Sequence, residues 1–211
     1  MRAGRAAVCL LIVLACVGAC DAPADNPIKL GQIAKVYKGG DARGAVEQLT
    51  AYLEQYPRDD LAWTVLGNAH EDLDQDDKAR AAYDRALAIN PRRHQAIGGL
   101  GVLLRKRGDD GAAMQAYRRA LAIEPGYGQA YSSMTVVALR LHRDAEGLEY
   151  AKKGYELDKT DPSTAANLAV AYHYNGDAAN RDRMTRIAID LGYRKADRLR
   201  QIYDGTLTVR K

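Results

Sequence analysis

Cysteine is missing from almost the whole chain, and its absence excludes several kinds of site. The 211 residues contain three cysteines, Cys9, Cys16 and Cys20, and none follows position 20. A disulfide framework, a structural zinc site with cysteine ligands and a cysteine nucleophile are therefore excluded from the rest of the chain. Phenylalanine is absent altogether, whereas there are 13 tyrosines, so tyrosine must fill the large aromatic positions of the core.

A strong excess of charge is also missing. The formal net charge of +4 is spread along the chain and is not gathered in a block. Two of the positive charges, Arg2 and Arg5, lie in a segment that we interpret as removed, which leaves basic and acidic residues almost balanced. Such a balance does not favour nucleic acid as a partner. Hydrophobic residues make up 47% of the chain, enough to bury a sizeable core.

Residues 1–19 have the organisation of a secretory signal peptide. Arg2 and Arg5 precede an unbroken run of apolar and small residues at 6–19. A basic start, a short apolar stretch and a small-residue cleavage site are typical of such peptides. The run is short for a membrane span, which needs about 20 apolar residues.

The residues VGAC at 17–20 resemble a bacterial lipobox, in which small residues precede a cysteine that is lipidated and becomes the new N-terminus. The resemblance implies a lipoprotein with palmitate-like acyl chains on Cys20, anchored in a bacterial membrane and facing the periplasm. Asp21 resembles a signal for retention at the inner membrane, and residues 20–27 predict a short tether. The alternatives are an ordinary cleaved signal peptide and a weaker lipobox that ends at Cys16.

A repeat of 34 residues is the strongest pattern in the sequence. Its clearest unit begins at Asp60, and the next unit begins at His94. Chance is a poor explanation for so many small and aromatic residues recurring in phase. The recurring residues of these two units are Trp63, Leu66, Gly67, Ala79, Tyr83, Ala86 and Pro91, then Ile97, Leu100, Gly101, Ala113, Tyr117, Ala120 and Pro125.

This spacing resembles the signature of the tetratricopeptide-repeat (TPR) family, in which an aromatic residue and Leu-Gly precede alanine, an aromatic residue, alanine and a closing proline. The resemblance implies an all-α fold, a right-handed superhelix (α-solenoid) of five helix-turn-helix repeats and a C-terminal capping helix. The outer units match more loosely, yet no insertion is needed. The expected TPR domain covers 28–205, with units at 26–59, 60–93, 94–127, 128–161 and 162–195, a cap at 196–205 and a tail at 206–211.

The residue types at fixed places of the unit fit this fold. Small residues such as Gly67 and Gly101 let helices approach closely, and Tyr83 and Tyr117 fill the space between units. One helix pair cannot bury its apolar face alone, so stacked neighbours make the core. Prolines stop the second helices, because proline lacks the N–H that a helix needs. The bends between paired helices are expected at Gly40, Asp74, Gly108, His142 and Gly176.

Motifs that would carry chemistry fail when their spacing is tested. The acidic run 72–77 begins like a calcium loop, but Asp77 and Tyr83 stand where that loop needs glycine and glutamate. The glycine-rich segment 98–101 lies inside a predicted helix, so close helix packing, or room for a ligand beside Gly98, explains it better than a phosphate loop. We expect no enzyme, no metal and no cofactor. Four scattered histidines remain, His70, His94, His142 and His173.

The first helices of a TPR stack line a concave groove, which implies where a partner would bind. Opposed charges along the groove would fix the direction of a bound peptide. The clamp that some TPR domains use for a chaperone's C-terminal carboxylate is absent, because only Asn68 fits its pattern. Carried onto this register, the groove residues are Tyr37, Lys38, Thr64, Asn68, Glu71, Asp72, Gln95, Val102, Arg105, Lys106, Ser132, Val136, Arg140, Asn167, Val170, His173 and Tyr174.

The sequence therefore predicts a non-catalytic adaptor or scaffold that binds a protein or peptide in this groove. Its architecture also resembles pilotin-type TPR lipoproteins, which help assemble a pilus or secretion pore, and TPR lipoproteins that scaffold cell-wall enzymes. A regulatory subunit of an enzyme and a periplasmic binding module without lipid are further alternatives. The repeat pattern identifies neither the partner nor the oligomeric state.

Overall fold

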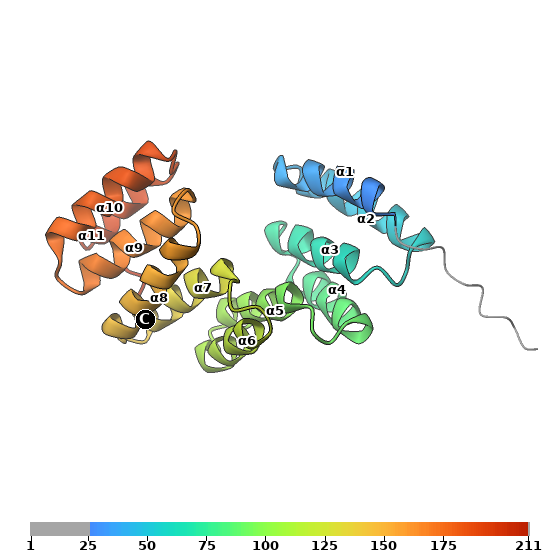
Figure 1. Ribbon diagram of the computed structural model, residues 1–211, viewed down its shortest axis with the longest axis horizontal. Coiled ribbons are helices and arrows are strands. Elements are labelled where there is room, and N and C mark those ends of the chain that lie inside the picture. Colours follow the sequence, from blue (N-terminus) through green and yellow to red (C-terminus); the bar gives the residue numbers. More distant parts are fainter. Residues whose placement is uncertain (1–25, 211) are drawn as a thin grey trace, which may run out of the picture.

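The computed structural model describes residues 26–210, which form paired helices with no strand among them. The pairs follow one another along the chain, and a last helix closes the stack (Figure 1). The expected all-α repeat fold with a capping helix is confirmed. The first helices are α1 (Pro27–Lys38), α3 (Asp60–Asp72), α5 (His94–Lys106), α7 (Gly128–Arg140) and α9 (Pro162–Tyr174); the second helices are α2 (Ala42–Gln55), α4 (Asp76–Ile89), α6 (Asp110–Ile123), α8 (Asp144–Leu157) and α10 (Ala178–Asp190); the last helix is α11 (Ala196–Tyr203).

The helix pairs keep a constant period. Each second helix begins 34 residues after the previous one, starting from Ala42 in α2. Each first helix packs against its own second helix and against the first helix of the next pair, and each second helix packs against the first helix that follows it. The pairs therefore form a curved row with α1 and α11 at opposite ends (Figure 1).

Each bend between paired helices contains a residue in the left-handed region. This region is easy for glycine and costs other residues about 1–2 kcal/mol. Aspartate and histidine adopt this left-handed conformation at two of the bends. The packing of the helices on either side must offset its cost there. The five residues expected at the bends all have positive φ: Gly40 at 93°, Asp74 at 54°, Gly108 at 84°, His142 at 58° and Gly176 at 74°.

Tyrosine fills the large positions of the core, as the lack of phenylalanine predicted. The side chains of Tyr52, Tyr83 and Tyr117 are at most 1% exposed. Buried tyrosines usually bond their hydroxyl, and here Tyr52 donates to Asp59 Oδ2 at 2.8 Å and Tyr83 donates to Asn68 Oδ1 at 2.7 Å. The rings of Tyr52 and Tyr83 thus fill the core while their hydroxyls stay hydrogen-bonded.

The glycine-rich segment 98–101 makes room for tyrosine rings. A Cβ atom on Gly99 would collide with the ring of Tyr83, and a Cβ atom on Gly67 of the preceding unit would collide with the same ring. Close packing, which the sequence favoured over a phosphate loop, is therefore what these glycines provide. Two further pairs have the same relation, Gly98 with Tyr127 and Gly101 with Tyr117.

Helix α11 covers the open end of the stack. Its Leu199 and Ile202 are 2% and 4% exposed and belong to the core cluster of α9. The hydroxyls of Tyr203 and Thr185 lie 2.7 Å apart and join α11 to α10. None of the described helices is long and apolar enough to cross a bilayer.

Replacing Gly99 by alanine should destabilise the stack by about 1–3 kcal/mol, because the added methyl group overpacks the Tyr83 ring. Urea unfolding of the full chain, followed by helical circular dichroism, measures the change. The matched control is Gly31→Ala in α1, where nothing lies within 4 Å of the new methyl group. That change should stabilise by up to about 1 kcal/mol, because alanine favours a helix more than glycine does. Equal effects at the two sites would contradict the role given to Tyr83.

Candidate functional site

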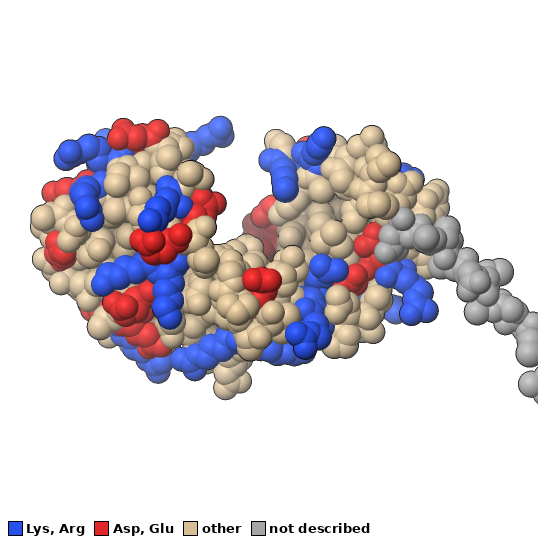
Figure 2. Space-filling view, viewed as in Figure 1, with Lys and Arg blue, Asp and Glu red and all other residues tan. Residues whose placement is uncertain are grey.

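The first helices of the pairs line the inner side of the curved row. Consecutive first helices pack side by side there, and Figure 2 shows the hollow that the curvature leaves between the two ends of the stack. A recess of about 330 Å³ lies on this face among α5, α7, α9, α11 and the residues that follow α11. The hollow lies where the TPR resemblance places the concave groove.

Carboxylates and hydroxyls gather at the N-terminal end of the hollow. The Tyr37 hydroxyl donates to Asp72 Oδ2 at 2.7 Å, which joins α1 to α3. Burial raises the pKa of Glu71; Lys106 and Arg105 oppose this rise, and Asp72 adds to it. This end of the hollow thus contains one carboxylate already hydrogen-bonded within the stack, Asp72, and one that is partly withdrawn from water, Glu71.

Two predicted groove residues lie in the core instead. Thr64 is 1% exposed, and its hydroxyl donates to the backbone carbonyl of Asp60 at 2.8 Å. Val102 is 9% exposed and packs in a cluster with Met114 and Val137. Neighbouring positions on one helix can face the groove or the next unit, and the 34-residue period does not separate them. Thr64 and Val102 therefore offer little exposed surface for a partner to contact.

Two predicted groove cations are held by carboxylates of the preceding unit. Lys106 Nζ lies 2.7 Å from Asp76 Oδ1 and 3.0 Å from Asp74 Oδ1. Arg140 Nε lies 3.5 Å from Oδ2 of the buried Asp110, in the first turn of α6. A carboxylate in the first turn also interacts favourably with the helix dipole. These cations join adjacent units, so reversing their charge would weaken the stack as well as any binding.

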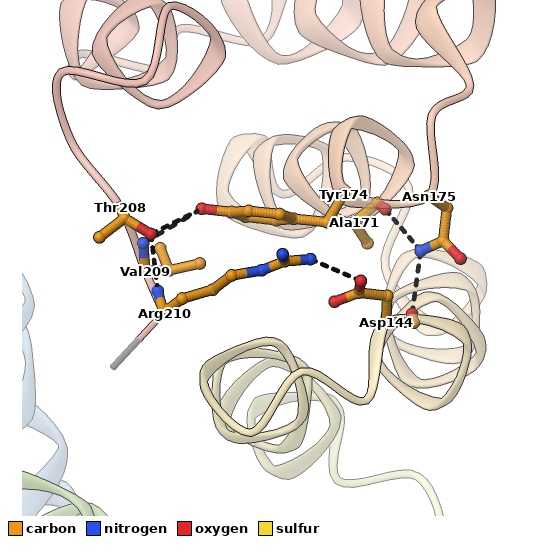
Figure 3. Close-up of polar contacts among 7 residues, drawn as sticks. All are labelled: Asp144, Ala171, Tyr174, Asn175, Thr208, Val209 and Arg210. Carbon is orange, nitrogen blue, oxygen red and sulfur yellow. Dashed lines mark hydrogen bonds and ion pairs between the residues drawn. The ribbon is translucent and has the colours of Figure 1, made fainter.

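Asp144, in the first turn of α8, repeats the place of Asp76 and Asp110 in their units. Each of those two aspartates pairs with a cation 30 positions further on, but the residue 30 positions after Asp144 is Tyr174. The register therefore leaves Asp144 without a cation from the next unit. Arg210, from the end of the chain, supplies the missing charge (Figure 3).

The C-terminal segment, residues 206–210, is docked on α8 and α9 through this pair. Arg210 Nη2 lies 2.5 Å from Asp144 Oδ2, and its guanidinium carbon lies 4.3 Å from the centre of the Tyr174 ring (Figure 3). The Tyr174 hydroxyl accepts the backbone N–H of Val209 at 3.2 Å. Sequence reasoning treated these residues as a plain tail. The sequence signal that could have revealed the contact is Asp144, because the residue 30 positions after it is Tyr174 and not a cation.

The recess combines predicted groove residues with residues that the repeat did not reveal. Its charged lining residues are all basic, and polar amides and hydroxyls surround them. The residues from 193 to 209, which we call the capping region, contribute because α11 packs over α9, and the signature of the 34-residue repeat does not mark these positions. The predicted members are Arg105, Ser132, Val136, Asn167 and Val170, and the capping region adds Tyr193, Lys195, Arg198, Leu199, Ile202 and Val209.

Three other predicted groove residues stand apart from the recess. The side-chain oxygen of Asn68 accepts a hydrogen bond from the hydroxyl of the buried Tyr83, as described above. Gln95 is half-buried on α5, and Lys38 is exposed at the end of α1. The structure therefore does not bring all the predicted residues into one site.

The aromatic end of the groove is packed by its own side chains. The imidazole of His173 lies 5.1 Å from the ring of Tyr174 and 5.1 Å from the ring of Tyr203, measured between ring centres. Burial lowers the pKa of His173, and the cations of Arg181 and Arg210 lower it further. Within residues 26–210 no group of histidine, cysteine, aspartate and glutamate side chains could hold a metal ion.

Replacing Arg210 by alanine should release the C-terminal segment and destabilise the protein by about 1–2 kcal/mol, because a partly exposed ion pair and a cation–π contact are lost together. Urea unfolding measures the energy, and faster hydrogen exchange at the Val209 amide reports the release. Arg200→Ala is the control, because its pair with Asp197 is largely exposed and should contribute less than about 0.5 kcal/mol. An unchanged exchange rate at Val209 would contradict the docking.

The model of the tetratricopeptide-repeat family matches residues 36–94 and 77–128. Three solved structures are similar over most of their length. A thermophilic TPR protein of Thermus thermophilus is 19% identical, with a TM-score of 0.71 over 85% of this chain and 97% of that one. PilF of Pseudomonas aeruginosa is 19% identical, with a TM-score of 0.67 over 85% of each chain. YrrB, described as a TPR protein with an unusual peptide-binding site, is 17% identical, with a TM-score of 0.53 over 85% of this chain and 91% of that one.

No curated protein sequence matches the chain. At these identities the structural neighbours show the fold, and the family match lies in the central pairs where the repeat signature is clearest. Residues 36–128 therefore match tetratricopeptide repeats, and the described chain has the fold of TPR proteins.

Proposed function

We propose that this chain is a non-catalytic adaptor that holds a protein or peptide partner in its concave groove, and that a lipid on Cys20 anchors it in a bacterial membrane, facing the periplasm. TPR proteins generally mediate protein–protein interactions, which sets the class of function. The observation that carries the proposal is the open recess on the inner face, where polar and basic side chains of several units meet around one space.

The size and lining of the recess favour a peptide or an exposed segment of a protein. A volume of about 330 Å³ is at the lower end of the range for binding pockets. The surrounding hollow continues along the first helices, so an extended chain could contact several units at once (Figure 2). Hydroxyl and amide groups of Ser132, Ser133 and Asn167 line the recess and suit hydrogen bonds to a peptide backbone.

The anchor is proposed from the sequence, because residues 1–25 lie outside the described part of the chain. The lipobox-like residues 17–20 and the short tether support it. The folded body would then stand close to the membrane, since the tether before α1 is only a few residues long. Asp21 favours the inner membrane. Pilotin-like assembly of a pilus or secretion pore, and regulation of a cell-wall enzyme, are the alternative roles; the identity of the captured partner separates them.

A photocrosslinking amino acid in place of Gln129 should capture a discrete partner in living cells, because Gln129 is exposed and lines the recess. The matched control is the same amino acid in place of Gln115, an equally exposed glutamine on the second helix α6. Mass spectrometry identifies the captured protein. Capture from Gln115 but not from Gln129 would move the binding surface away from the groove.

Labelling with radioactive palmitate should mark the wild-type protein and not the Cys20→Ala variant, because the thiol of Cys20 is the proposed attachment point. Membrane fractionation should follow the label, with the variant recovered in the soluble fraction. Cys16→Ala is the control and should keep both label and membrane binding. Label retained by Cys20→Ala and lost by Cys16→Ala would assign the anchor to the other lipobox.

A further inference from the structure

We propose that the recess beneath the cap is a subsite for acidic side chains, so that the groove binds an acidic segment of its partner. The inference rests on the proposed function and deepens it. It assigns binding residues to the capping region, which no repeat position marks, and it gives the chemistry of the partner that the recess recognises.

Three cations converge on the recess from two parts of the chain. Arg105 comes from α5, while Lys195 and Arg198 come from the start of the capping helix. None of the three forms an ion pair with another residue in the 26–210 range, and no aspartate or glutamate lines the recess. Like charges around one small space repel one another, and an anion placed among them relieves that repulsion.

The cations elsewhere on the inner side of the stack behave differently. Lys106, Arg140 and Arg210 each pair with an aspartate of a neighbouring unit. Those three cations are held within the stack, whereas the cations of the recess meet no acidic residue in its lining. Glu71 is near enough for Arg105 to oppose the rise of its pKa, but the two side chains form no ion pair.

The remaining lining suits a carboxylate on a short aliphatic stem. Ser132, Ser133 and Asn167 offer hydroxyl and amide donors near the cations, and such donors strengthen the binding of a carboxylate. Leu199 and Val209 add an apolar wall, against which the CH₂ groups of a glutamate can pack. Val209 belongs to the C-terminal segment, so the docking of Arg210 also completes this wall.

Three separate cations favour an acidic segment over a single carboxylate. One terminal carboxylate would satisfy one or two of them, whereas neighbouring aspartate or glutamate side chains could reach all three. We therefore commit to side-chain carboxylates within a peptide. A free C-terminal carboxylate is the competing source of the same chemistry, and an amidated probe separates the two.

The test measures binding of a fluorescein-labelled hexaglutamate peptide, amidated at its C-terminus, to the purified full chain in detergent by fluorescence anisotropy. We expect it to bind roughly tenfold more tightly than a hexaglutamine peptide of the same length, with an affinity that falls as salt is added. The double variant Lys195→Glu with Arg198→Glu should weaken hexaglutamate binding roughly tenfold, because two attractive contacts become repulsive.

A second double variant, Arg186→Glu with Arg194→Glu, is the matched control. It makes the same change in net charge at exposed residues near the cap that do not line the recess. It should weaken binding less than about twofold, because neither side chain lines the recess and exposed charges outside it are partly screened by solvent and salt. Circular dichroism of both double variants should match the wild type, because all four residues are exposed.

Equal binding of the hexaglutamate and hexaglutamine peptides would overturn the proposal, as would equal losses in the two double variants. Binding that requires a free C-terminal carboxylate would replace it with a terminal-carboxylate site. These failures are distinct from failure of the proposed function. If the crosslinker at Gln129 still captures a partner, the groove binds a partner of other chemistry; if it captures nothing, the adaptor function itself fails.

Discussion

The ring of Tyr83, packed where a Cβ atom on Gly67 or Gly99 would collide with it, sets how closely two adjacent helix pairs can approach. In the next unit the ring of Tyr117 packs in the same way against Gly101 of its own helix pair. A single pair cannot bury its own apolar face, so the stack exists only through such interfaces. The curvature of the row, and with it the hollow on the inner side, follows from how these rings hold the first helices side by side.

A second recurring contact decides which charges remain for a partner. An aspartate in the first turn of α4 and of α6 pairs with a cation of the following unit, and this consumes Lys106 and Arg140. For Asp144, in the first turn of α8, the chain end provides the cation in the form of Arg210. Cations outside this series, such as Arg105 and Arg198, have no carboxylate of their own within the described residues. Three such cations meet in the recess under the cap, and this is the chemical basis of the proposed acidic partner.

The sequence predicted the fold well because every unit needs the same packing contacts, so the residues that make them recur every 34 positions. The bends at Asp74 and His142 were placed by register alone, although neither residue is the glycine that adopts a positive φ most easily. The groove was predicted less completely. Thr64 was assigned to it but is buried, since a family position gives a helix face only approximately. The cap and the C-terminal segment have no place in the period, so their part in the recess depends on tertiary contacts that no local pattern encodes.

The most direct test of the account is hydrogen exchange of the full chain, measured with and without the partner that the groove captures. The account predicts slower exchange in α5, α7, α9 and α11 when the partner binds, because these helices line the recess. The second helices α4, α6 and α8 should be unchanged. Slower exchange confined to the second helices would contradict the claim that the concave face is the partner-binding surface.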